Sequence, residues 1–238
     1  MSEKTFTTKT VLPKNTVVDD KLKPTAEMHI LVGGPYTSGG VEHLYGHTAL
    51  YIRLKGKEYI YDFGRYGLIY SETVALGLTL EGVDSPRGEG ILRVWNSFAK
   101  YIQSENSYGR STWGYKYLIF DAQADKVVNH FSDLTKTTKR HQSTGNMVSY
   151  KLPTDYFALG PNCTTLSVDA AKKAVPKIVA GSEKYIKPEE VLPWHARKAM
   201  EMKYGTPKHI FLPANLKTYL DTTPAVRVDE KKTYGGGR

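Results

Sequence analysis

The chain has 238 residues, of which 40% are hydrophobic, and this length allows one domain of mixed helix and strand to bury a substantial core. Its net charge of +9 favours an anionic partner, but the lysines and arginines are scattered and lack interleaved aromatic residues, so a solvated basic surface is expected rather than a nucleic-acid site. One cysteine excludes an intramolecular disulfide framework and a multi-cysteine zinc centre, and no cofactor or metal is expected.

The N-terminal residues are polar and rich in lysine and threonine, and Pro13 and Pro24 interrupt them. Such a composition cannot bury enough apolar surface to fold, so residues 1–26 are expected to form a flexible arm. The apolar run Met28 to Val32, bounded by glycines, predicts the first strand of a single domain over residues 27–222. The glycines that follow lack the spacing of a phosphate-binding loop, so no nucleotide site is expected.

The clearest hairpin spans residues 47–63, where two alternating segments flank a two-residue turn at Lys55-Gly56. This turn sets the register of the strands and places Ala49 opposite Asp62. Asp62 is then a diagonal cross-strand neighbour of His47 on the same face. An imidazole and a carboxylate are therefore expected to meet across the hairpin.

Beyond the hairpin, apolar periodicity predicts further strands and helices. The strands are expected at residues 91–95, 115–120 and 147–152, and the helices at residues 121–134 and 189–204. His130 lies in the first of these helices and is expected on the surface. The polar segment 223–238 ends in a run of glycines and is expected to be a flexible tail.

The only cysteine lies where a helix is expected to begin. Gly160-Pro161 interrupts the preceding segment, Asn162 is a favoured N-cap, and residues 164–175 have the pattern of a helix that Pro176 ends. Cys163 therefore lies in the first helical turn, where backbone N–H groups and the helix dipole favour a thiolate and could hold an oxyanion. A free cysteine is also a common small buried hydrophobe, so this residue alone does not establish catalysis.

A thiol at a helix start, an imidazole on a strand and a carboxylate beside it are the parts of a cysteine-based catalytic triad. Cys163 is expected to be the nucleophile and His47 to take the thiol proton and return it to the leaving amine. Asp62 is expected to orient the imidazole and stabilise its charged form. His43, in the preceding loop, is an alternative base, and Asn162 could serve only as the helix cap.

Three short motifs contain these residues, in the order histidine, aspartate, cysteine. They are Gly46-His47-Thr48-Ala49-Leu50, Tyr61-Asp62-Phe63-Gly64 and Asn162-Cys163-Thr164-Thr165. They resemble the circularly permuted, NlpC-type branch of the papain-like cysteine peptidases, in which the histidine strand precedes the nucleophile helix. The resemblance implies an α+β fold in which that helix packs on an antiparallel sheet. It also implies hydrolysis of amide bonds, often those of peptidoglycan stem peptides.

Among such proteins, basic ones without a signal peptide resemble antibacterial effectors of the type VI secretion system. The sequence shows neither an apolar signal segment at its N-terminus nor a run of about 18 apolar residues, so we expect neither general secretion nor a membrane span. The resemblance then implies a cytoplasmic location in the producing cell, where an immunity protein is the partner, and delivery to the periplasm of a target bacterium.

Two alternatives stay open on the sequence. Permuted relatives also include protein deconjugases and lipid acyltransferases, which use the same thiol chemistry on other substrates. A non-catalytic module whose basic surface binds an acidic partner would need Cys163 only for packing.

Overall fold

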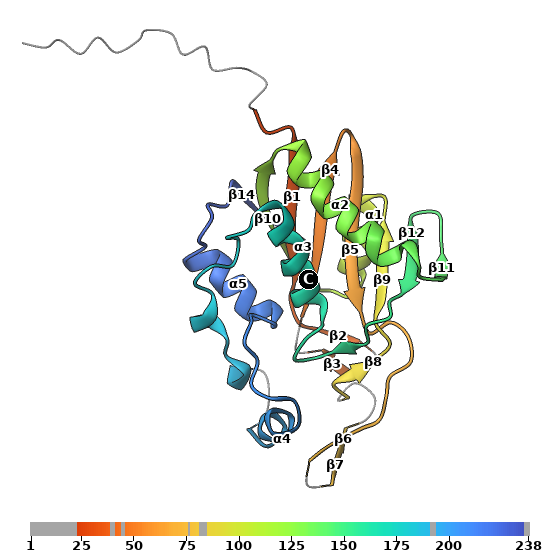
Figure 1. Cartoon of the computed structure of the whole chain (residues 1–238), viewed down its shortest axis with the longest axis vertical. Coiled ribbons are helices and arrows are strands. Elements are labelled where there is room, and N and C mark those ends of the chain that lie inside the picture. The colour runs from red at the N-terminus through yellow and green to blue at the C-terminus, as the bar shows by residue number, and fades with distance from the viewer. Residues whose placement is uncertain are drawn as a thin grey trace, which may run out of the picture.

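The computed structural model describes residues 23–38, 41–43, 46–75, 77–80, 85–190 and 194–235. Within these residues the protein has an α+β fold built on one large antiparallel sheet, as predicted, with helices on both faces (Figure 1). In spatial order, the eight strands of this sheet are β11 (Arg140–Ser143), β12 (Met147–Lys151), β9 (Ile91–Trp95), β5 (Lys57–Gly64), β4 (His47–Leu54), β1 (Ala26–Gly33), β10 (Thr112–Ile119) and β14 (Glu230–Tyr234).

The β4–β5 hairpin has the predicted turn and register. Lys55 and Gly56 have positive φ angles of 51° and 76°, as in the two-residue turns whose twist matches that of the flanking strands. Ala49 pairs with Asp62, which places the Asp62 carboxylate on the same face of the sheet as His47. The local sequence of the turn therefore determines which side chains meet across the hairpin.

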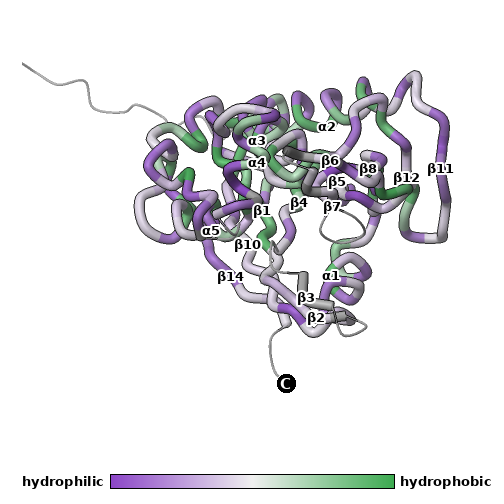
Figure 2. Tube along the Cα trace, turned by 90° about the horizontal axis from the view of Figure 1, so that it is seen from below, coloured by the Kyte–Doolittle hydropathy of each residue, from purple (hydrophilic) through white to green (hydrophobic). Residues whose placement is uncertain are grey.

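Helices cover both faces of the sheet, and side-chain alternation along the strands divides the core between them. The helices are α1 (Phe98–Ser107), α2 (Asp121–Lys136), α3 (Cys163–Ala174), α4 (Trp194–Tyr204) and α5 (Pro213–Thr222). On one face, Leu50 and Ile52 of β4 belong to an apolar cluster shared with α2, α3 and α5. On the other face, Ala49 and Tyr51 pack with Tyr101 of α1. Figure 2 shows the sheet between these layers.

Helix α2 has the predicted amphipathic pattern. Ala124, Val127 and Phe131 are buried, and the Phe131 ring stacks on Tyr61 of β5 with centroids 3.8 Å apart. His130 is half-buried rather than on the surface, because α3 packs beside α2 on this side. Its burial, with the positive charge of a nearby lysine, lowers the pKa of His130.

Several small elements gather at the end of the sheet where β4 begins (Figure 1). They are β2 (Tyr36–Ser38), β3 (Val41–His43), β6 (Glu72–Ala75), β7 (Leu78–Leu80), β8 (Arg87–Gly88) and β13 (Tyr156–Phe157). Of the predicted helix 189–204, the described part is α4 from Trp194 onward, and Pro188–Glu190 forms a separate short 3₁₀ turn; residues 191–193 are not described. Helix α4 ends before Gly205 as predicted, where a φ of 83° favours glycine.

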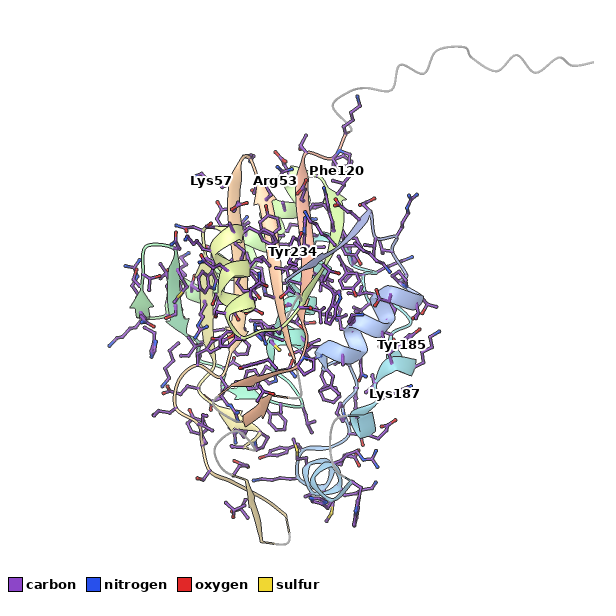
Figure 3. The ribbon with its side chains drawn as sticks, turned by 180° about the vertical axis from the view of Figure 1, so that it is seen from behind. Arg53, Lys57, Phe120, Tyr185, Lys187 and Tyr234 are labelled. Atoms are coloured by element: carbon purple, nitrogen blue, oxygen red, sulfur yellow. The ribbon has the colours of Figure 1, made fainter. Side chains whose placement is uncertain are left out.

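The C-terminal segment differs from the sequence-based expectation. Glu230–Tyr234, predicted to belong to a flexible tail over residues 223–238, form β14 beside β10. Tyr234 lies over the face that α1 covers, with its ring 5.1 Å from that of Phe98 (Figure 3). The strand escaped prediction because it is an edge strand with mostly exposed polar side chains, so it lacks an apolar alternation. Residues 236–238 lie outside the described part of the chain.

The N-terminal prediction concerns residues that are largely outside this description. Residues 1–22 of the expected arm are not among those described, and β1 begins at Ala26. Across the helices that are described, none combines the length and the apolar character needed to cross a bilayer.

Candidate active site

Helix α3 begins at the cysteine, one residue before the predicted start, and Asn162 caps it as predicted. The Asn162 Oδ1 accepts hydrogen bonds from the backbone N–H groups of Thr164 and Thr165, both at 3.0 Å. The Asn162 Nδ2 donates to the carbonyl oxygens of Ala158 and Phe211, at 2.7 and 3.0 Å. This one buried side chain therefore fixes the helix start to the preceding loop and to the segment before α5.

Small and hydroxylated side chains bring α3 close to β4. The hydroxyl groups of Thr164 and Thr48 hydrogen-bond at 3.0 Å, and the Ser167 hydroxyl donates to the Thr48 carbonyl at 3.5 Å. Ala170, one turn further along, is fully buried, so the helix packs directly on the strand. This packing holds the start of α3, and with it Cys163, at the end of β4 where His47 lies.

The structure brings together the three residues that the sequence predicts. The Nε2 atom of His47 lies 2.6 Å from Oδ1 of Asp62, and the two side chains are almost fully buried. The Cys163 thiol interacts electrostatically with the same imidazole, and each side chain shifts the pKa of the other. Cys163 is only 3% exposed, so this contact is shielded from bulk water.

Electrostatics favour the charged forms of the His47 imidazole and the Cys163 thiol. Burial by itself lowers the pKa of His47, but the Asp62 carboxylate and the hydrogen bond to Cys163 outweigh it and raise this pKa to about 10. Burial by itself raises the pKa of Cys163, but the charge and hydrogen bond of His47, with hydrogen bonds from the Thr48 backbone and the Thr164 side chain, lower it overall. The site therefore favours a thiolate–imidazolium pair.

Two side chains that the sequence analysis does not identify surround Asp62. The Tyr66 hydroxyl donates to Asp62 Oδ1 at 2.8 Å and lies 3.5 Å from His47 Nε2. The Arg93 guanidinium lies 3.3 Å from the centroid of the Tyr66 ring, and its Nη1 is 3.9 Å from Asp62 Oδ2. Burial raises the pKa of Asp62, but the charges and hydrogen bonds of these neighbours and of His47 hold it below its usual value.

A buried ion pair lies behind the histidine. Arg110 Nη2 is 2.5 Å from Glu105 Oε2, and both side chains are almost fully buried. Gly33, the residue paired with His47 in the sheet, makes room for them, because a Cβ atom there would lie 3.1 Å from both side chains. Burial raises the pKa of Glu105, although the charges of His47 and Arg110 oppose this. The sequence-based site does not include this pair, because the segment around Glu105 has no clear helical pattern.

The alternative base, His43, stays a prediction. Its backbone belongs to β3, where it pairs with Tyr36, and its side chain lies outside the described atoms. Tyr66 lies four residues after Asp62 and could have been sought from the sequence, whereas Arg93 lies near Asp62 only because β9 pairs with β5. Among the residues described, no group of three histidine, cysteine or acidic side chains is arranged to hold a metal ion.

Comparison with known proteins adds no relative. No protein-family profile matches the sequence, and searches of curated proteins and of solved structures return no significant match. The structure therefore defines the class as an α+β protein with a large antiparallel sheet, and the function has to be argued from the site itself.

Proposed function

We propose that this protein is a cysteine hydrolase that cleaves amide bonds, with Cys163 as nucleophile, His47 as general base and acid, and Asp62 as the group that orients the imidazole. The observation that carries the proposal is that His47 bridges the thiol at the start of α3 and a buried carboxylate 2.6 Å from its ring. A merely structural cysteine needs neither partner.

The arrangement supplies each step of amide hydrolysis. The thiolate attacks the carbonyl carbon, and the carbon–oxygen π electrons move to the oxygen. Collapse of this intermediate breaks the carbon–nitrogen bond, and the imidazolium of His47 protonates the departing amine. A water molecule, deprotonated by His47, then attacks the thioester and releases the acid and the thiolate. The Asp62 carboxylate stabilises the imidazolium throughout.

The start of α3 can hold the oxyanion formed in both attacks. The Asn162 side chain accepts from the N–H groups of Thr164 and Thr165, which leaves the N–H of Cys163 as the first-turn donor at the reacting sulfur. The partial positive charge at a helix N-terminus favours negative charge at the same place. The nucleophile and the oxyanion donor therefore belong to one residue.

We further propose, from the sequence resemblance, that the fold is the permuted papain-like, NlpC-type arrangement and that the substrate is a peptidoglycan stem peptide. The net charge of +9 supports an anionic polymer such as the bacterial cell wall as the surface on which the enzyme works. In this proposal the protein is an antibacterial effector of type VI secretion, held in check by an immunity protein in the producing cell and active in the periplasm of the target.

The decisive test begins with the thiol. The rate of Cys163 alkylation by iodoacetamide, from pH 5 to 9, is expected to be high already at low pH in the parent and to lose this low-pH reactivity in His47→Ala. Slow alkylation that follows an ordinary thiol in both proteins would favour a non-catalytic module instead.

Peptidoglycan fragments are the second part of this test. The parent is expected to release new amino groups from them, and Cys163→Ala to release none. Turnover of a lipid ester or of a ubiquitin-like conjugate, with no cleavage of peptidoglycan, would keep the thiol chemistry and overturn the substrate.

A further inference from the structure

The Asp62 carboxylate is held by more than its pairing with His47. Rotation about χ2 of an aspartate is a soft torsion, so a carboxylate with one partner has no fixed plane. Here Oδ1 accepts from both His47 Nε2 and the Tyr66 hydroxyl, at 2.6 and 2.8 Å, while Oδ2 faces Arg93 at 3.9 Å. Both oxygens are thus engaged, from three different parts of the chain.

The chain around Tyr66 is shaped to bring its ring back over the sheet. Tyr66 follows β5 by two residues, and a Cβ atom at Gly64 would lie 2.5 Å from its ring atoms Cε2 and Cζ. Only glycine at this position allows the ring to fold back. The Arg93 guanidinium then stacks on the ring at 3.3 Å, and the Arg93 side chain remains 24% exposed. The ring and the guanidinium together cover the buried carboxylate.

We propose that Tyr66 and Arg93 are positioning residues, which hold the Asp62 carboxylate in the plane in which it pairs with His47 and keep water away from that pair. The inference rests on the proposed function, because it assigns these two side chains a part in preparing the same nucleophile. Neither residue touches the thiol. Their effect on Cys163 passes through Asp62 and then His47.

The other charged groups around Asp62 do not hold its carboxylate in the way that Tyr66 and Arg93 do. The titratable and charged side chains that face it are His47 of β4, Tyr66 after β5, Arg93 of β9, Tyr101 and Glu105 of α1, and Arg110 before β10. Glu105 and Arg110 neutralise each other at 2.5 Å, and Tyr101 is a buried neutral phenol. Tyr66 and Arg93 are the members of this set, besides His47, that contact the Asp62 oxygens.

The direction in which the pKa of Cys163 moves when the Tyr66 hydroxyl is removed distinguishes positioning from simple charge withdrawal. If the hydroxyl only withdrew charge from Asp62, its removal would strengthen the Asp62–His47 pair and lower the pKa of Cys163 further. If it positions the carboxylate, its removal weakens the pair, so the pKa of His47 falls and that of Cys163 rises. A hydrogen bond to a charged group is strong enough to move such values by about one pH unit.

The experiment is the pH dependence of iodoacetamide alkylation in the parent, Tyr66→Phe and Tyr70→Phe. The Tyr70 hydroxyl also donates to a carboxylate, that of Asp155 at 3.1 Å, so Tyr70→Phe removes the same group without touching the His47 pair. We expect the acid limb of the Tyr66→Phe profile to move up by about one pH unit and the Tyr70→Phe profile to overlay the parent. An unmoved or downward-shifted limb in a folded Tyr66→Phe would overturn the inference.

Arg93→Lys is the second variant, since it keeps the charge but removes the planar stacking. It is expected to shift the limb in the same direction, and NMR titration of the His47 ring is expected to show a lower pKa in both site variants. If Tyr66→Phe does not fold, the alkylation profile and the His47 titration of Arg93→Lys test the positioning role in its place. A parent without low-pH reactivity would contradict the proposed function, whereas a reactive parent with unaffected variants contradicts only the positioning role.

Discussion

Replacing Cys163 with alanine should change how the stability of the fold depends on pH, because folding raises the pKa of His47 and lowers that of Cys163. His47 keeps its proton to about pH 10 in the folded protein and to about pH 6.5 in the unfolded chain. Its stabilisation is complete below pH 6.5 and is lost as the pH rises toward 10. Cys163 has a lowered pKa in the fold, so its stabilisation is complete above its unfolded pKa of about 8.5 and is lost as the pH falls.

The size of the effect follows from counting protons. Between about pH 6.5 and 8.5, the folded protein holds a proton on His47 that the unfolded chain has lost, and the lowered pKa of Cys163 gives a slope of the opposite sign, so the two slopes oppose each other. One uncancelled proton changes the free energy of unfolding by about 1.4 kcal/mol per pH unit. Cys163→Ala keeps the His47 slope alone. The variant should lose about 2 to 3 kcal/mol of unfolding free energy across this range, and the parent should lose less, because the Cys163 slope opposes that of His47.

Urea unfolding of parent and Cys163→Ala, at steps of half a pH unit from pH 6 to 9.5, measures the difference between their free energies of unfolding. Every other titrating group contributes equally to parent and variant. Cys163→Ser is the matched control for side-chain size. Its hydroxyl does not titrate here, so it should follow the alanine variant. Free energies of parent and Cys163→Ala that run parallel through this range would refute the thiolate–imidazolium pair.

Three further substitutions test the supports of the site. Asp62→Asn should lower the pKa of His47 and reduce kcat/KM on the order of 100-fold, measured beside alkylation at pH 6; an unchanged rate would remove Asp62 from the site. Asn162→Ala should lower the free energy of unfolding by about 1 to 2 kcal/mol by urea titration, and Asn162→Asp, which keeps the cap, should lose less. Gly33→Ala should cost about 1 to 3 kcal/mol by crowding the buried ion pair, whereas Gly145→Ala meets nothing within 4 Å; equal melting temperatures would contradict this.

The most informative sequence prediction was the hairpin register, and it succeeded for a local reason. A two-residue turn at Lys55-Gly56 leaves one way to pair the strands, so the meeting of His47 and Asp62 follows from residues close in sequence. The start of α3 was predictable in the same way, since Gly160-Pro161 and Asn162 act within a few residues.

The features that escaped prediction depend on distant parts of the chain. Arg93 reaches Asp62 only because β9 pairs with β5, and no local pattern states which strand is the neighbour. Strand β14 is polar because it is an edge strand, and it forms because β10 offers it a partner. Helix α5 was not identified from its sequence, although Leu216 and Leu220 are fully buried against the sheet. Tertiary pairing, rather than propensity, determines each of these.

The two halves of the candidate site are joined over very different lengths of chain, and this bears on the order in which they assemble. His47 and Asp62 are 15 residues apart, whereas the Thr48–Thr164 contact that docks α3 spans 116 residues. Closing the longer loop costs about 2 kcal/mol more in chain entropy, and Cys163 leaves the ribosome long after the hairpin does. The acid–base pair can therefore form while Cys163 is still an ordinary thiol. If the proposed function holds, the reactivity of that thiol is a property of the completed fold and is gained only when α3 docks.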